Sequence, residues 1–577
     1  MGFGKKETMR SLELGQLQGP DLIAVLYIIC YFLVNLSFLS DFPFVHSDES
    51  WLSGLSRNMA EKGSIGVTES FFDLKPRFPH AIKTLFHLMQ MGMMRIFGYE
   101  IATFRLLSLI FGCLSLFLFY RTLKAAIEGA QRSILPLLGC ILLSVDIQFL
   151  YAAHFARQEI LLVFMLILCL NFILQKRPAA AGVATGLCIG IHPNSFLLAA
   201  MCGLMLLPLD LSALRSREGR RPLLQYAAVV SGFAALFVAV SLYLDREFVR
   251  HYAAYGSSEF EIGAPVTHKL AEFPYFLKKI WLQVSGTYYV PDIRVELVLF
   301  ALILAVSIAI LIWFKPWAGT PVEAVSETAS AAWTGTSFSA LAGTTAQLKL
   351  LALIRLLLKG ILGMAVGMVV IGRYNQTSIV FFFPLFFMLL IAELKLIFTS
   401  SRLFRGKGMR QSVLPILLIL LIGCSSILQI RPWLTPSHSY ETYLEEISKA
   451  VLPDHNVLAN LNSEYYFENG MLLDYRNLAY LKENQLSVAD YIREKQIEYI
   501  ILSNEMDLIY AQRPVWNIIY GNPRYMEELR EFTKEKCTLV HSFQNNIYGV
   551  RIIPYMDRSD HSFTVEIFKV EDPAREP

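Results

Sequence analysis

Residues 22–49 read LIAVLYIICYFLVNLSFLSDFPFVHSDE, and this stretch decides the fold. Leu22–Ser40 is an apolar run of roughly the ~20 residues that a helix needs to cross a bilayer. No small-residue cleavage site follows it, so we expect an uncleaved membrane helix rather than a signal peptide. The chain leaves this helix at a polar segment that contains Asp48 and Glu49. The sequence therefore predicts two carboxylates at a membrane surface.

The same apolar pattern recurs as far as Ile430 and predicts a mainly α-helical, polytopic membrane domain over residues 1–430. Only 17% of the 577 residues are charged, below the roughly 25% of soluble domains. We expect about eleven transmembrane helices, centred on Leu22–Ser40, Ile101–Leu123, Ile134–Leu150, Ile160–Leu174, Ala179–Ile191, Phe196–Leu209, Leu223–Leu244, Leu297–Phe314, Leu350–Ile371, Ile379–Leu396 and Val413–Leu428.

The distribution of Lys and Arg predicts the topology. Basic residues gather in alternate loops, for example around Lys124, Arg177, Arg217 and Arg405. The positive-inside rule places these loops and the N-terminus in the cytoplasm. An odd number of spans then puts the C-terminal region outside, with two long loops at residues 41–100 and 245–296. We expect a multi-pass protein of the cytoplasmic membrane, and a net charge of +3 does not suggest nucleic acid as a partner.

Residues 431–577 have the composition of a soluble domain. Short β-rich runs alternate with amphipathic helices, which predicts a small extracytoplasmic α/β domain. It contains no Gly-rich phosphate loop or nucleophile elbow, so we expect it to bind the acceptor or shield the membrane site. The expected strands are Asn456–Ala459, Glu498–Ser503, Thr538–Ser542 and Asn546–Ile553, and the expected helices are Ser487–Lys495 and Pro523–Lys534.

The first outer loop predicts two amphipathic helices along the membrane surface, one beginning at Ser47 and one over His80–Phe97. Asp48 and Glu49 in a first helical turn are stabilised by the helix dipole, with Ser47 as the cap. A carboxylate there is also placed to accept a proton from an attacking hydroxyl. The two interpretations are compatible.

Further polar groups fall at the same predicted surface. Lys75 and Arg77 are candidates to pair with a lipid phosphate, or are attracted to headgroups in general. Arg157 and Glu159 either form an ion pair that ends a span or face a shared cavity. Together with the His192–Ser195 and Gly372–Gln376 turns, these clusters supply carboxylates and cations for displacing a lipid phosphate. His251, His268 and Glu259 match no zinc spacing, so a divalent metal cofactor is left open.

An ordered set of short motifs resembles the GT-C glycosyltransferases, in the branch of the protein O-mannosyltransferases and the lipid A aminoarabinose transferase. The set comprises Asp48-Glu49, Arg57-Asn58-Met59, Lys75-Pro76, Arg157-x-Glu159 and Arg373-Tyr374, over roughly the first 400 residues. Two departures are Arg77 in place of the second proline of Lys-Pro-Pro, and Glu159 in place of the usual aspartate.

The resemblance implies that a monosaccharide is transferred, with inversion, from a polyprenyl- or dolichyl-phosphate donor. It implies that Asp48 is the general base, that Glu49 orients or assists it, and that Glu159 positions a cation or an acceptor group. Candidate phosphate-binding residues are Lys75, Arg157, Arg373 and Arg57, and candidate substrate-binding residues are Tyr374, His192 and Asp73. An acceptor that attacks through an ionised phosphate would need no base.

Three other functions remain open at this stage. A transporter or flippase of lipid-linked saccharides would explain the helices and buried charges, although no paired broken helices in two related halves are evident. A lipid-carrier polymerase or ligase would use an oligosaccharide diphosphate donor. A non-catalytic assembly factor would tolerate substitution of Asp48. The expected partners are the lipid donor, membrane lipids and an acceptor that is protein, lipid or glycan.

Overall fold

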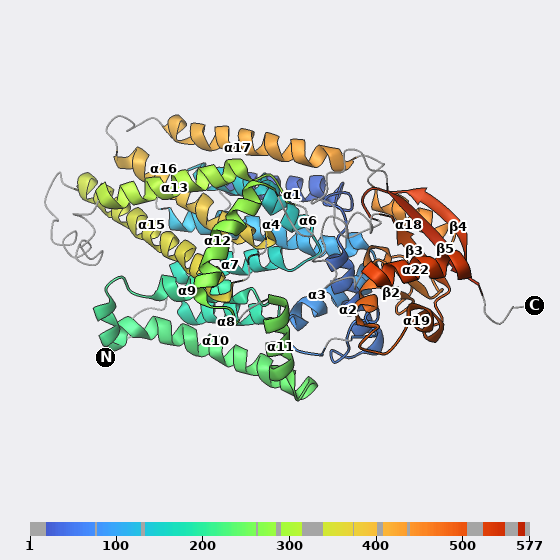
Figure 1. Cartoon of the computed structure of the whole chain (residues 1–577). Helices are drawn as coiled ribbons and strands as arrows, with labels where there is room; N and C mark the ends of the chain where they lie inside the picture. The colour runs from blue at the N-terminus through green and yellow to red at the C-terminus, as the bar shows by residue number, and fades with distance from the viewer. Residues whose placement is uncertain are drawn as a thin grey trace, which may run out of the picture.

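The computed structural model describes residues 19–75, 78–127, 133–260, 263–283, 290–313, 338–372, 374, 376–400, 408–434, 439–504, 523–548 and 563–571. A long helical bundle carries a smaller α/β domain at one end (Figure 1). The bundle helices are α1 (Gly19–Leu36), α4 (Ile101–Ala126), α5 (Leu135–Ser144), α6 (Ile147–His154), α7 (Glu159–Leu174), α8 (Pro178–Ile189), α9 (Ser195–Leu206), α10 (Arg217–Leu244), α13 (Arg294–Trp313), α15 (Phe338–Ile371), η5 (Gln376–Phe382), α16 (Phe383–Ser400) and α17 (Gly408–Ile430).

Each of the eleven predicted spans is found as helix. Within the described residues, seven stretches are long and apolar enough to cross a membrane: α1, α4, α10, α13, α15, η5 with α16, and α17. The bent pair α5 and α6 makes one more, and the short apolar helices α7, α8 and α9 coincide with the remaining predictions. The chain is a multi-pass membrane protein.

The predicted span Ile134–Leu150 is broken, because α5 and α6 meet at an angle of 63°. Asp146 begins α6, and its Oδ1 accepts hydrogen bonds from the backbone N–H groups of Gln148 and Phe149. An aspartate that caps a new helix in this way separates it from the preceding one. The break brings the end of α6, at His154, to the end of the bundle that carries the α/β domain.

Helices on the outside of the bundle differ from those inside it. The most apolar window of α10 is only 6% buried, whereas the window over η5 and α16 is 94% buried. Side chains such as Leu224, Leu236 and Val238 on α10 are therefore exposed in a continuous apolar surface, as expected of a helix that faces lipid. Inside the bundle, α9 packs on α15 and α4 packs on α7.

Shorter helices occupy the two long loops: α2 (Ser47–Lys62), α3 (Thr84–Phe97), α11 (Phe248–Phe260) and α12 (Val266–Trp281). The helix predicted to begin at Ser47 is present as α2, but it lacks the exposed polar face of an amphipathic helix, and its position along the membrane surface stays a prediction. Polar residues such as Ser53, Ser56 and Asn58 on α2 are buried along with Leu52 and Met59. The reason is that the C-terminal domain covers α2 on one side and α3 packs on the other.

The C-terminal domain contains a five-stranded sheet in the order β2-β1-β3-β5-β4. The first three strands in that order are parallel, and β5 pairs antiparallel with both β3 and β4. Its elements are η7 (Arg431–Leu434), α18 (Tyr440–Ser448), β1 (Val457–Ala459), η9 (Leu461–Ser463), β2 (Leu472–Asp474), η10 (Tyr475–Tyr480), α19 (Val488–Glu494), β3 (Tyr499–Ser503), α22 (Pro523–Lys536), β4 (Cys537–Gln544) and β5 (Thr564–Val570).

Three of the four predicted strands and both predicted helices of this domain are confirmed. The fourth strand, Asn546–Ile553, is not, because residues 546–548 form a bend and residues 549–553 lie outside the described part of the chain. The sequence also missed β2, β5 and α18.

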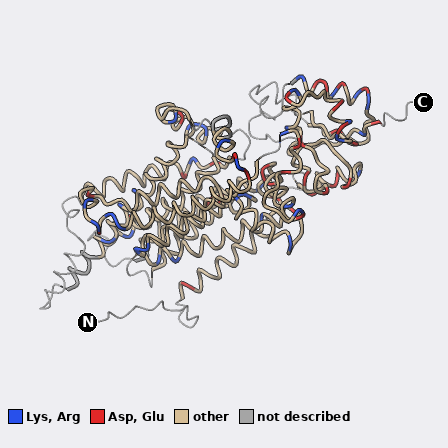
Figure 2. The backbone as a smooth tube through the Cα atoms, turned by 90° about the horizontal axis from the view of Figure 1, so that it is seen from below, with Lys and Arg blue, Asp and Glu red and all other residues tan. Residues whose placement is uncertain are grey.

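Charged residues are concentrated at the two ends of the bundle and over the α/β domain (Figure 2). At the end remote from that domain, positions of Lys and Arg predominate (Figure 2). The predicted topology depends on this enrichment of Lys and Arg at the end of the bundle opposite the C-terminal domain.

Candidate active site

The first turn of α2 is fixed by two side chains. His46 caps the helix, because its Nδ1 accepts a hydrogen bond of 3.0 Å from the backbone N–H of Asp48. Glu49 Oε2 accepts one of 3.0 Å from the N–H of His46 in return. This is a reciprocal capping box in which histidine takes the place of serine or threonine. The predicted cap, Ser47, is instead the first residue of the helix.

Glu49 also ties α2 to the bundle. Both of its carboxylate oxygens receive hydrogen bonds of 2.9 Å from Arg105 on α4, and Oε1 accepts another of 2.8 Å from the N–H of Ala156. The Glu49 and Arg105 side chains are fully buried. Arg105 further donates to the carbonyls of Leu39 and Ser40, just beyond α1. A buried bidentate pair of this kind holds four segments together.

Arg157 lies between the other two predicted catalytic carboxylates. Its Nη1 is 3.1 Å from Asp48 Oδ2, and its Nη2 is 3.1 Å from Glu159 Oε1. All three side chains are at most 12% exposed. The arrangement joins the first turn of α2 to the first turn of α7 through one guanidinium. The structure therefore brings Asp48, Glu49, Arg157 and Glu159 together, as the sequence predicts.

A short break between α6 and α7 presents Arg157 to this cluster. The helix α6 ends at His154, whose ring stacks on Phe38 with centroids 5.0 Å apart. The N–H of Arg157 then donates to the carbonyl of Phe155 at 2.6 Å, which forms a tight turn before α7 begins at Glu159. Because the N–H of Ala156 is bound by Glu49, the position of this turn is set by the same carboxylate that fixes α2.

The segment η5 approaches the cluster from the other side. Thr377 donates a hydrogen bond of 2.9 Å to Glu159 Oε1, and Asn194 donates one of 3.0 Å to Ser378. His192 accepts from the N–H of Asn194 and so shapes the turn that joins α8 to α9. Glu159 Oε2 is buried and has no hydrogen-bond partner among the described residues. A buried carboxylate oxygen without a partner can accept a hydrogen bond from a donor such as a hydroxyl group.

Tyr374 stands further from the carboxylates and contacts α12. Its hydroxyl donates to the carbonyl of Lys269 at 2.7 Å, and its ring stacks on Phe276. Lys269 in turn donates from Nζ to the carbonyl of Val370 at 2.9 Å. The helix α12 therefore covers the end of α15. Arg373, and also Pro76 and Arg77, lie outside the described residues.

The structure places three other candidate residues against the C-terminal domain. Arg57 donates to the carbonyl of Phe467 at 2.7 Å and stacks on Tyr99, about 13 Å along the helix axis from Asp48. Lys75 lies over the ring of Tyr480. Asp73 accepts a hydrogen bond of 2.9 Å from Tyr491 on α19, and its second oxygen is 3.0 Å from the ammonium of Lys495 on the same domain.

Two buried groups behind α2 have shifted pKa values. Burial raises the pKa of Glu464 to about 8, although Arg57 at 4.0 Å acts in the opposite direction. Burial also lowers the pKa of His87 on α3 to about 3, so this ring is neutral at physiological pH. Ser56 on α2 bonds to His87 and to Gln90, so the polar face of α3 packs on α2.

Among the described residues, no group of three or more His, Cys, Asp or Glu side chains is arranged to hold a metal ion. His251 instead contacts Asp245 at 2.6 Å and Glu247 at 3.5 Å.

Sequence reasoning missed Arg105, Thr377 and Ser378. Arg105 had a visible signal, because it is a lone arginine inside the apolar span Ile101–Leu123, where an ionisable residue is costly without a partner. Thr377 and Ser378 carried no such signal, since hydroxyl residues are common at the ends of membrane helices.

No protein-family model matches the sequence, and no curated protein matches it. Among solved structures, the chain is similar to ArnT from Cupriavidus metallidurans bound to undecaprenyl phosphate, with 12% identity and a TM-score of 0.38 over 94% of this chain and 97% of that one. It is also similar to the oligosaccharyltransferase AglB from Archaeoglobus fulgidus in complex with an inhibitory peptide and a dolichol-phosphate, with 12% identity and a TM-score of 0.47 over 94% and 75%.

Proposed function

We propose that this protein is an integral membrane glycosyltransferase that moves a monosaccharide from a polyprenyl-phosphate donor to an acceptor hydroxyl on the outer face of the membrane. The observation that carries the proposal is the buried cluster of Asp48, Arg157 and Glu159 at one end of the apolar bundle. A carboxylate beside a cation at membrane depth provides a base for the acceptor and a counter-ion for a departing phosphate.

The reaction that fits this geometry is a single displacement. The acceptor oxygen attacks the anomeric carbon from the face opposite the phosphate, and Asp48 accepts the hydroxyl proton. The bond between the anomeric carbon and the phosphate oxygen breaks, and the phosphate leaves with the electron pair beside Arg157. Because attack and departure occur on opposite faces, the configuration at the anomeric carbon inverts.

The contacts of Arg157 suggest how donor binding prepares the base. In the structure, Nη1 of Arg157 contacts Asp48 Oδ2. A phosphate bound at Nη1 takes the place of that carboxylate and leaves Oδ2 available to the acceptor. Glu159, which Thr377 also contacts, keeps the guanidinium in place through Nη2 during this exchange. Glu49 is a positioning residue, because its oxygens are occupied by Arg105, His46 and Ala156.

The outer location depends on the separation of charge. The cluster lies at the start of α2, which packs next to the C-terminal domain (Figure 1), and the Lys- and Arg-rich end of the bundle is opposite (Figure 2). The positive-inside rule then places the cluster outside the cytoplasm, in the cytoplasmic membrane of a cell. A lipid-linked donor suits this side, since nucleotide sugars are charged and do not cross the bilayer unaided.

The test is a transfer assay with the purified full chain and radiolabelled polyprenyl-phosphate sugars, using membrane extracts as the source of acceptor. We expect Asp48→Asn to lower transfer by about 10²–10⁴-fold, the usual contribution of a general base. Asp454→Asn, the same change at an exposed turn of the C-terminal domain, should leave transfer unchanged. Full transfer by Asp48→Asn would overturn the assignment of Asp48 as the base. If the wild-type protein and the Asp454→Asn control both fail to consume any donor, the proposed reaction is wrong.

A further inference from the structure

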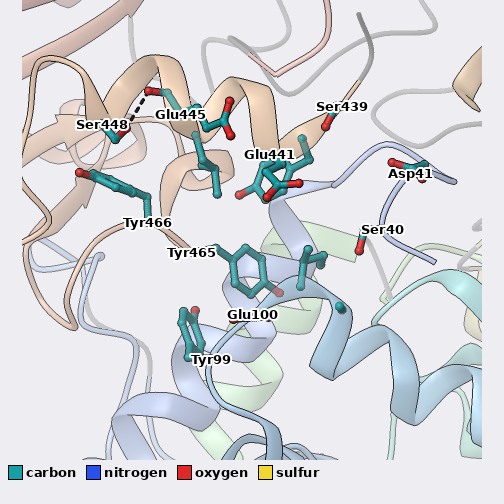
Figure 3. Close-up of a pocket in the computed structure, with 14 residues that line it drawn as sticks. Ser40, Asp41, Tyr99, Glu100, Ser439, Glu441, Glu445, Ser448, Tyr465 and Tyr466 are labelled. Atoms are coloured by element: carbon teal, nitrogen blue, oxygen red, sulfur yellow. Dashed lines mark hydrogen bonds between the residues drawn. The ribbon is translucent and has the colours of Figure 1, made fainter. Parts of the chain in front are cut away.

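A cavity separate from the Asp48, Arg157 and Glu159 cluster lies between the bundle and the C-terminal domain (Figure 3). Its volume is about 430 Å³, within the range of sites that hold small molecules. One wall is α18 of the C-terminal domain, and the opposite wall is formed by the ends of α1 and α4 with the residues next to them. None of the sequence motifs discussed above falls in this cavity.

The walls are acidic. Asp41 and Glu100 come from the bundle side, and Glu441 and Glu445 come from α18. None of these four carboxylates forms a salt bridge with a lysine or arginine in the described part of the chain, and the nearby Lys449 pairs with Glu446 instead. Several carboxylates that face one cavity make its potential negative and favour a cationic ligand.

The remaining lining suits a sugar ring. Tyr99 and Tyr465 lie side by side with ring centroids 5.1 Å apart, and Tyr440 and Tyr466 complete the aromatic surface. Aromatic faces pack against apolar C–H surfaces and also attract ammonium groups. Serine hydroxyls at Ser40, Ser439 and Ser448 line the same space, so polar partners are spread over several walls. A simple aliphatic amine such as a lysine side chain has no hydroxyl groups that could form hydrogen bonds with these serines.

The cavity is linked to the helix that carries Asp48. Ser53 on α2 donates a hydrogen bond of 2.9 Å to the hydroxyl of Tyr465. Ser53 lies about 7.5 Å along the helix axis from Asp48. On another wall, the carbonyl of Ser40 accepts a hydrogen bond from Arg105, the partner of Glu49. A ligand in the cavity therefore contacts Tyr465, which bonds to α2, and Ser40, which bonds to the arginine that pairs with Glu49.

We propose that this cavity binds an amine-bearing sugar unit of the acceptor. Its ammonium group pairs with Glu441 and Glu445, and its ring packs on the tyrosines. The role as acceptor subsite rests on the proposed function, whereas the binding itself does not need the donor or the reaction.

The test is calorimetric titration of the full chain in nanodiscs, without donor, using a glucosamine disaccharide and its N-acetylated form as probes. We expect the free amine to bind about fivefold more tightly, because Glu441 and Glu445 are exposed and each exposed ion pair contributes only about two- to fivefold. The double variant Glu441→Gln/Glu445→Gln should weaken binding of the free amine by about fivefold and leave binding of the acetylated probe unaffected. The matched control is Glu527→Gln/Glu531→Gln, two exposed glutamates on α22 of the same domain.

Equal binding of the two probes, or an equal loss in the control variant, would overturn the proposal. Tighter binding of a lysine tripeptide than of the amino sugar would overturn the choice of a sugar. All the substituted glutamates are exposed, so an unchanged thermal unfolding curve is expected for both variants. If the amine does not bind, the result of the transfer assay on Asp48 still stands. If Asp48→Asn retains transfer, the amine-binding measurement still stands.

Discussion

The two ends of α2 are held in different ways. Its first turn is inside the bundle, where Glu49 binds Arg105 and Asp48 binds Arg157, all nearly or fully buried. Its second half contacts the C-terminal domain, where Arg57 donates to a backbone carbonyl and stacks on Tyr99. Charged residues at the first end pair with one another, and in the proposed reaction Arg157 exchanges Asp48 for the donor phosphate. Charged residues at the other end attach a domain, so their presence in a family-like motif does not by itself indicate contact with the donor.

The largest expected effect is at the buried pair. Replacing Glu49 by Gln leaves Arg105 buried without its counter-ion, which costs roughly 3–5 kcal/mol of stability. We expect a poorly folded protein and lost transfer, measured by thermal unfolding in detergent and by the transfer assay. The double variant Glu49→Gln/Arg105→Met removes both charges and should recover much of the unfolding temperature. A stable, fully active Glu49→Gln protein would show that the first turn of α2 is held in another way.

The next effect concerns the interface end of α2 and pH. Burial raises the pKa of Glu464 from 4.5 to about 8, so the folded protein binds a proton that the unfolded chain releases. Protonation of Glu464 therefore adds to the free energy of unfolding. This contribution is fully present below pH 4.5 and is lost as pH rises through about 8, by up to about 1.4 kcal/mol per pH unit. Hydrogen exchange around residues 461–467 should therefore be faster at pH 7.5 than at pH 5.5, after correction for the intrinsic rate.

Glu464→Gln should remove that pH dependence, because the amide has no proton to lose. Glu468→Gln, at a nearby exposed position, serves as the control and should retain it. The same pH dependence in both variants would contradict Glu464 as the group that loses the proton.

A smaller effect is expected at the loop that follows α2. Asp73→Ala removes a hydrogen bond to Tyr491 and an ion pair with Lys495, both partly exposed. The loss should be near 1.5 kcal/mol, the lower end for bonds to charged groups. Limited proteolysis should then release the C-terminal domain faster, while transfer per folded molecule falls by no more than a few-fold. Loss of donor binding in this variant would instead place Asp73 in the substrate site.

The membrane part of the fold was predictable because lipid imposes a strong constraint on sequence. Every span needs a run of apolar residues, and all eleven predicted runs are helical. The break at Asp146 was not predicted, because one aspartate inside an apolar run does not interrupt the hydropathy pattern. In the C-terminal domain, β2 has only three residues, which is too few to show a period, whereas the alternation of Val565, Glu566 and Ile567 in β5 was visible in the sequence and was overlooked.

The candidate site was predictable in part for a similar reason. Asp48, Arg157 and Glu159 are charged residues at the ends of apolar runs, and such residues must find partners. Their mutual contacts, and those of Glu49 with Arg105, depend on how α2, α4 and α7 pack, which no local pattern encodes. For Arg57, Lys75 and Asp73 the family resemblance implied donor or substrate contacts, whereas in the structure the C-terminal domain supplies their partners. The roles of these residues in substrate binding stay predictions.

The most direct test compares the two ends of α2 through their arginines. Binding of undecaprenyl phosphate, which has no sugar and cannot react, would be measured in nanodiscs for Arg157→Gln and Arg57→Gln. The account predicts that Arg157→Gln weakens binding by at least about tenfold, through loss of a charge-assisted contact to phosphate. Arg57→Gln, which removes the same group at the domain interface, should change binding by less than about twofold. Unchanged binding in Arg157→Gln, or an equal loss in both variants, would contradict a donor site at Asp48, Arg157 and Glu159.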